Sequence, residues 1–230
     1  LEGALLPALD LFFGALSGRA GVVGILALYS GLARGRMGVV APMTAVLSAS
    51  IPVIVGILTE GIPPVLVLVG FGLAVTAVWL LSGGGKTDGI RRNELGLALL
   101  AGLGFSLFLV LLDQLSTGAI VWALTAARVA SVPLLLLFIL GRRTWQGITK
   151  TRLPRSLLPI IALSGILDSG GNYFFALATQ SGRLDIAAVL ASLYPASTVL
   201  LARLILKETL GPRQWLGVAV ALVALVFIAL

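Results

Sequence analysis

The chain has 230 residues, of which 59% are hydrophobic and 11% charged, and its mean hydropathy is +1.11. Soluble domains carry roughly 25% charged residues, so this composition excludes a water-soluble fold and indicates an all-α membrane protein. The net charge of +7 does not indicate a nucleic-acid partner, because the basic residues lie between the apolar segments, as in the cytoplasmic loops of membrane proteins.

Eight apolar segments along the chain approach or exceed the roughly 20 residues that a transmembrane helix needs. They are 10–33, 38–58, 63–82, 94–112, 118–140, 157–179, 185–206 and 212–230. Prolines stand near the starts of several segments, where a residue without an N–H fits the first helical turn. Arg19 interrupts the first segment, either as a charge at mid-depth in the membrane or as the mark of a break in the helix.

The connections between these segments differ in charge. Those after the first, third, fifth and seventh segments are basic, whereas the opposite side has only Arg183 among several acidic residues. Because cytoplasmic loops are enriched in Lys and Arg, we expect the basic connections to be cytoplasmic and the C-terminus to face outward. The sequence thus predicts a multi-pass protein of the cytoplasmic membrane.

An internal repeat relates the first three segments to the last three. A shift of 147 residues superimposes Ser17-Gly18 on Ser164-Gly165, Gly24 on Gly171 and Gly35-Arg36 on Gly182-Arg183; one insertion later, Glu60 meets Glu208 and Pro64 meets Pro212. Related segments are five helices apart, an odd number, so they cross the membrane in opposite directions. Inverted-topology repeats of this kind are typical of secondary transporters.

The repeat also predicts the domain organisation. Segments 94–112 and 118–140 have no counterpart upstream, and the chain begins with Leu rather than Met. We therefore expect two further helices before Leu1 and a complete bundle of ten helices in a 5+5 inverted repeat. Residues 1–83 would be the remainder of the first repeat, 84–93 a cytoplasmic linker and 94–230 the second repeat.

Two stretches resemble a known family. Residues 182–217 read GRLDIAAVLASLYPASTVLLARLILKETLGPRQWLG, and residues 27–60 read ALYSGLARGRMGVVAPMTAVLSASIPVIVGILTE. These stretches resemble the EamA family of the drug/metabolite transporter superfamily. The shared features are a helix of small residues ending in Gly-Arg, a central Ser-Leu-Tyr-Pro, a Lys-Glu, and a Gln-Trp-Leu-Gly that opens the last helix. In the first half, Thr-Glu-Gly replaces the family's Gly-Glu-Arg.

The resemblance implies ten helices in two inverted five-helix repeats around a central cavity. It also implies movement of small organic solutes, often export of amino acids, metabolites or drugs. It does not identify the substrate.

Arg128 and Asp168 are the main candidate site residues. Each lies midway along its helix, and the two helices are consecutive and antiparallel, so an ion pair at mid-depth is geometrically allowed. Charges at this depth are costly and mark functional sites by default. Three readings stay open: a pair that only fixes helix packing, a substrate or proton site, or no contact at all. In the second reading, Asp168 alternates between pairing with Arg128 and binding a proton, which couples proton entry to solute exit.

Further candidates accompany this pair at helical spacing. Asn172 follows Asp168 by one turn, two hydroxyl residues share a face of 38–58, and Tyr194 precedes a proline inside 185–206. The alternative for the hydroxyl residues is hydrogen bonding between helices. The glycines of 157–179 are expected to allow close approach of a neighbouring helix. The further candidate site residues are Arg19, Thr44, Ser48, Asn172, Tyr173 and Tyr194.

The residues that are missing narrow the function. The chain has no His and no Cys, which removes the commonest metal ligands and nucleophilic pairs, so we expect no enzyme, no metal and no cofactor. It also has no G-x-x-x-x-G-K-[ST] motif for nucleotide binding. The predicted function is that of a secondary transporter. Its expected partners are a small-molecule solute and the lipid bilayer. A channel-like or structural subunit, a lipid translocator and association as a homodimer are the open alternatives.

Overall fold

The computed structural model describes residues 8–33, 37–81, 92–116, 118–146, 154–194, 196, 204 and 211–229. Within these ranges the chain forms helices and turns and no strand, which confirms the all-α prediction. The helices are α1 (Ala8–Leu32), α2 (Met37–Glu60), α3 (Val65–Leu81), α4 (Arg92–Asp113), α5 (Ile120–Gln146), the 3-10 turn η1 (Arg155–Leu157), α6 (Leu158–Ser181), α7 (Leu184–Ser192) and α9 (Pro212–Ala229).

Five of these helices are long and apolar enough to cross a membrane, namely α1, α2, α4, α5 and α6. The apolar helices α3 and α9 are shorter. Seven of the eight predicted segments thus coincide with described helices. Of the predicted segment 185–206, only α7 and a few later residues lie inside the described ranges, and Pro195 lies outside them.

One boundary differs from the prediction, and one open alternative is decided. The helix expected to end at residue 140 continues as α5 to Gln146, because arginine is a good helix former and two arginines follow Gly141 in the sequence. Arg19 does not break α1, which is continuous from Ala8 to Leu32. α2 ends after Glu60, because Gly61 adopts a φ of 85°, a left-handed conformation that terminates helices and that glycine adopts easily.

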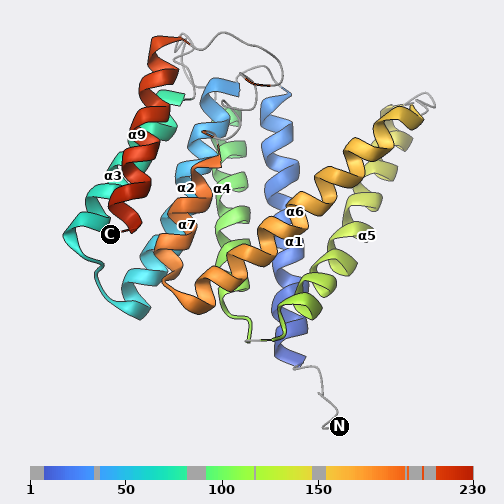
Figure 1. Ribbon diagram of the computed structural model, residues 1–230. Coiled ribbons are helices and arrows are strands. Elements are labelled where there is room, and N and C mark those ends of the chain that lie inside the picture. Colours follow the sequence, from blue (N-terminus) through green and yellow to red (C-terminus); the bar gives the residue numbers. More distant parts are fainter. Residues whose placement is uncertain are drawn as a thin grey trace.

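Helix α1 lies against α4 and α5, α2 packs on α4 and α7, and α3 packs on α9 at the periphery (Figure 1). Consecutive helices run in opposite directions, so α2, α4 and α6 end at one end of the bundle. We call this the Arg183 end, after the residue between α6 and α7, and we call the opposite end, where α1, α3 and α5 finish, the basic end. An apolar cluster built around Phe71, Val78 and Ile228 joins α3 and α9 to α2 and α7.

Small residues bring α1 very close to its neighbours. A Cβ added to Gly14 or Gly18 would lie 2.2 Å from the carbonyl oxygen of Ala123 or Ala127 on α5. One added to Gly104 on α4 would lie 2.7 Å from the backbone nitrogen of Gly24. Close backbone approach at small residues is the usual way in which membrane helices associate, and here it fixes α1 between α4 and α5.

A proline inside α2 is compensated by a neighbouring helix. Pro52 has no N–H, so the carbonyl of Ser48, one turn earlier, has no partner within the helix. The hydroxyl of Ser106 on α4 donates to this carbonyl at 3.1 Å and to that of Leu47 at 2.8 Å. The carbonyl that Pro52 frees is therefore used for helix packing.

The charge distribution predicts which end of the bundle is cytoplasmic. Because α9 begins at the basic end, its last residue points toward the Arg183 end, which we expect to face outward. A reporter fused after Leu230 that is active only outside the cytoplasm should be active, whereas the same reporter inserted in the linker 84–93 should be silent. The reversed pattern would show that the orientation is wrong.

Candidate substrate cavity

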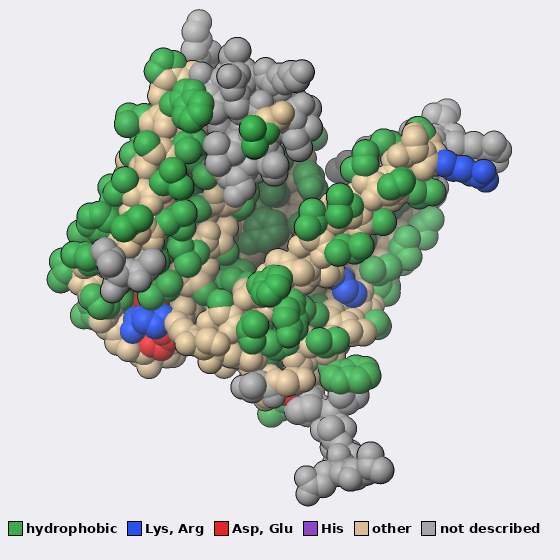
Figure 2. Space-filling model, in the orientation of Figure 1, with side chains coloured by type: hydrophobic (Ala, Val, Ile, Leu, Met, Phe, Trp, Pro, Cys, Tyr) green, Lys and Arg blue, Asp and Glu red, His purple; other side chains and the backbone are tan. Residues whose placement is uncertain are grey.

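A cavity of about 370 Å³ lies between α1, α2, α4, α5, α6 and α7. Figure 2 shows a hollow with hydrophobic side chains between the part of the molecule that contains α3 and α9 and the arm formed by α5 and α6. Most of the lining is aliphatic, aromatic or glycine. The polar lining residues are Tyr29, Ser48, Arg128, Ser131, Asp168, Asn172, Ser192 and Tyr194.

Arg128 and Asp168 form an ion pair in the wall of this cavity. The guanidinium donates through Nη2 to Asp168 Oδ2 and, at 3.3 Å, to the hydroxyl of Ser169. Asn172 donates through Nδ2 to the same carboxylate oxygen at 3.5 Å. The side chains of Arg128 and Asp168 are 45% and 55% exposed. The pair is therefore accessible to a small molecule in the cavity, and the reading in which the two residues make no contact is wrong.

The two helices place this pair through their regular geometry. α5 and α6 are antiparallel neighbours joined at the basic end, and Arg128 and Asp168 lie inside both helices, away from their ends. Asn172 follows Asp168 by four residues and thus lies on the same face of α6. On the other side of the pair, a shallow depression is lined by Arg128, Asp168, Ser169 and Gly165 among others.

Three other candidates do not line the cavity. Arg19 is exposed on α1, and Tyr173 is 37% exposed, with its ring edge-to-face against Phe174 at a centroid distance of 5.8 Å. Thr44 is completely buried, and its hydroxyl oxygen has no hydrogen-bond partner in the described part of the chain. Ser48 does line the cavity, but its hydroxyl donates within α2 to the carbonyl of Ala45 at 2.8 Å.

Several lining residues were not selected from the sequence. Phe105 and Phe108 of α4 contribute aromatic surface, Tyr29 lies near the basic end of α1, and Ser192 lies at the end of α7. Gly21 of α1 also lines the cavity, and it is the residue that the 147-residue shift superimposes on Asp168. That correspondence could have predicted that this face of α1 lines the cavity. Nothing in the sequence distinguishes the two phenylalanines from core residues.

The arrangement combines one cation, one anion and an amide with apolar surroundings. Such a site can bind a small solute through a few oriented polar contacts while apolar walls enclose the rest of it. No group of three or more acidic, His or Cys side chains that could hold a metal ion exists among the described residues.

Comparisons with known proteins agree with this architecture. One solved crystal structure superposes on this chain with a TM-score of 0.62 and 16% sequence identity, covering 98% of this chain and 88% of the other. At this identity the likeness shows a common fold. A comparison with curated protein sequences finds no significant match.

The family is shown by sequence. The model of the EamA-like transporter family matches residues 93–230, which is more than half of the chain and includes the helices that carry Arg128 and Asp168. Together with the apolar helices, this match identifies the chain as a multi-pass membrane protein that belongs to the EamA-like transporter family.

Proposed function

We propose that the chain is the larger part of a secondary transporter that exports small organic solutes across the cytoplasmic membrane by alternating access, in exchange for protons. The observation that supports this best is the ion pair of Arg128 and Asp168 in the cavity wall. A charge inside a membrane protein is retained at a cost and is by default functional. Because each side chain is about half exposed, a solute or a proton can reach the pair without prior unfolding.

The pair supplies both binding and coupling. A solute with an anionic group competes with Asp168 for Arg128, and one with a cationic group competes with Arg128 for Asp168. When the solute occupies Arg128, Asp168 loses its counter-charge and binds a proton. The proton and the solute therefore replace one another at the same two side chains, which is the condition for exchange.

We further propose that the complete transporter has ten helices in an inverted 5+5 repeat. Under the repeat, α1 corresponds to α6, α2 to α7 and α3 to α9. Helices α2 and α7 pack on each other, as do α3 and α9, which is the pairing expected around a pseudo-two-fold axis. Helices α4 and α5 would then have counterparts that precede α1 in the complete polypeptide.

The environment of α6 supports these two additional helices. In an 18-residue apolar stretch of α1, 39% of the residues are buried, against 6% in the corresponding stretch that includes α6. Gly18 and Gly24 on α1 contact α5 and α4, whereas their counterparts Gly165 and Gly171 on α6 meet no atom of the described chain within 4 Å of an added Cβ. α6 thus has the small residues of a packing surface without the helices that cover it.

The function is tested by counterflow in liposomes. The chain would be reconstituted both alone and as the polypeptide with the two preceding helices, and amino acids and small metabolites would be screened as labelled solutes. A carrier gives saturable uptake that depends on unlabelled solute inside. Flux that never saturates would instead favour a channel, and no flux with any solute in either form would contradict the transport proposal.

A further inference from the structure

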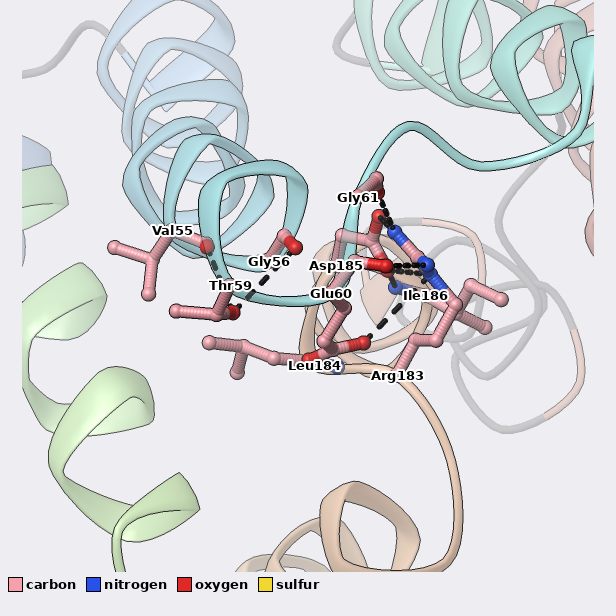
Figure 3. A network of polar contacts seen from close by, with 9 residues as sticks. All are labelled: Val55, Gly56, Thr59, Glu60, Gly61, Arg183, Leu184, Asp185 and Ile186. Carbon is pink, nitrogen blue, oxygen red and sulfur yellow. Dashed lines mark hydrogen bonds and ion pairs between the residues drawn. The ribbon is translucent and has the colours of Figure 1, made fainter.

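At the Arg183 end of the bundle, one arginine joins the end of α2 to the start of α7 (Figure 3). Arg183 donates through Nη1 to the carbonyl of Glu60 at 3.1 Å and through Nη2 to that of Gly61. It also donates to both oxygens of the Asp185 carboxylate, at 3.1 and 2.9 Å. The guanidinium thus satisfies carbonyls at the C-terminal end of α2 while it binds a carboxylate in the first turn of α7.

The two carboxylates tighten this contact. Glu60 Oε2 lies 3.7 Å from Nε of Arg183, and its Oε1 accepts a hydrogen bond of 3.2 Å from the backbone N–H of Leu184 at the start of α7. Asp185 is completely buried. A Cβ added to Gly56 of α2 would lie 2.9 Å from the Cβ of Asp185, so the two helices touch at this point. We call Glu60, Arg183 and Asp185 the clamp.

Arg183 keeps its positive charge under physiological conditions. Its hydrogen bond to Asp185 raises the pKa of Arg183 above the ordinary arginine value. A raised pKa means that the positive charge is fully present at every lower pH and is lost only above that value. Deprotonation of Arg183 therefore does not release the clamp, which must open by exchanging its protein partners for water.

The cavity lies deeper in the bundle than the clamp. Ser48, which lines the cavity, precedes Glu60 by twelve residues on α2, or about 18 Å along the helix axis. Ala191, which also lines it, follows Asp185 by six residues on α7, or about 9 Å. From there the cavity extends to Tyr29, three residues before the end of α1 at the basic end. Along α2 and α7, the clamp thus lies between the cavity and the Arg183 end.

We propose that Glu60, Arg183 and Asp185 form the gate that closes the cavity toward the Arg183 end, so that the described structure is the state closed at that end. This inference rests on the proposed alternating-access function. The clamp joins α2 to α7, one helix from each proposed repeat, and these are the parts that move relative to one another in alternating access. Its bonds are polar and its Arg183 side chain is 24% exposed, so water can replace them on opening.

The gate is tested by the accessibility of one cysteine in the cavity. The natural chain has no Cys, so Ala191→Cys gives a single exposed thiol in the cavity wall. Sealed vesicles are treated with a membrane-impermeant thiol reagent from one side at a time. A separate variant, Gln114→Cys, places an exposed thiol just after α4 at the Arg183 end and identifies the side on which that end lies.

Arg183→Gln should raise the rate of labelling from the Arg183 end by about tenfold or more, because it removes the charge-assisted hydrogen bonds that join α2 to α7. The rate of labelling from the basic end should be the same as in the unchanged protein or lower. Arg213→Gln is the matched control, since Arg213 lies over the ring of Trp79 at 4.1 Å and takes no part in the clamp.

Two results would overturn the gate. Unchanged labelling from the Arg183 end, in both Arg183→Gln and Glu60→Gln, would reduce the clamp to a static contact. An equal rise from both ends would show general loosening of the bundle. Since labelling requires no transport, a failed counterflow screen combined with the expected labelling would contradict the proposed solute exchange and leave the gate in place.

Discussion

Asp168→Asn is expected to abolish accumulation of the solute against its gradient while leaving the protein folded. Asparagine has the size of aspartate and can still accept a hydrogen bond from Arg128, but it neither carries the negative charge nor binds the proton. One proton moving through about 100 mV supplies about 2.3 kcal/mol, which corresponds to a solute gradient of roughly 50-fold. For a solute without net charge, the variant should therefore reach a ratio of about one.

The measurement is the steady-state solute ratio in liposomes under an imposed proton gradient and membrane potential. Asp113→Asn is the matched control, because Asp113 is also a helix carboxylate but lies at the end of α4 and not in the cavity wall. This control should keep the full ratio. Wild-type accumulation in Asp168→Asn would show that the carboxylate does not couple transport to protons.

The double variant Arg128→Gln, Asp168→Asn separates coupling from packing. Removing one member of an ion pair leaves the other charge uncompensated, whereas removing both avoids that cost. If the pair only fixes α5 against α6, the double variant should recover both the fold and the gradient-driven flux that a single change loses. If the pair binds the solute and the proton, the double variant should fold and still fail to accumulate solute.

The sequence predicted the elements of this fold better than their partners. Long apolar runs and prolines indicated the helices, because the thickness of the bilayer fixes their length. The mid-helix placement of Arg128 and Asp168 allowed an ion pair without deciding whether it forms. The end of α5 was misplaced because two arginines suggested a loop, although charged residues also suit the last turn of a helix. For Arg19 the sequence left open either a charge inside a continuous helix or a break, and α1 is continuous.

The composition of the cavity wall was harder to predict. Ser48 and Thr44 lie one turn apart on α2, yet only Ser48 reaches the cavity, while Thr44 is completely buried. That difference depends on which helices pack beside α2, and a single helix does not determine it. The role of Arg183 was missed for the same reason: in the sequence it is an isolated charge in a short connection, and its partner Glu60 is 123 residues away.

The second large effect is expected at Gly18. Gly18→Ala should destabilise the bundle by about 1–3 kcal/mol, the usual cost of overpacking a close contact. The added Cβ would lie 2.2 Å from the carbonyl oxygen of Ala127, and because this atom is backbone, only a shift of α1 away from α5 can relieve the clash. The loss would be measured as a lower midpoint of thermal unfolding in detergent, followed by the fraction of protein that stays monodisperse.

Gly165→Ala is the matched control, because the repeat superimposes Gly165 on Gly18 and an added Cβ there meets nothing within 4 Å. In the present chain this change should be neutral or stabilising by about 0.5–1 kcal/mol, since glycine inside a helix is unfavourable relative to alanine. In the polypeptide with two preceding helices it should become destabilising, as Gly18→Ala is here. A neutral Gly165→Ala in both forms would mean that α6 has no helix packed on its glycines, and the ten-helix proposal would be wrong. A change of sign between the two forms would show that the two preceding helices pack on the face of α6 that bears Gly165. It would also explain why so little of α6 is buried in this chain.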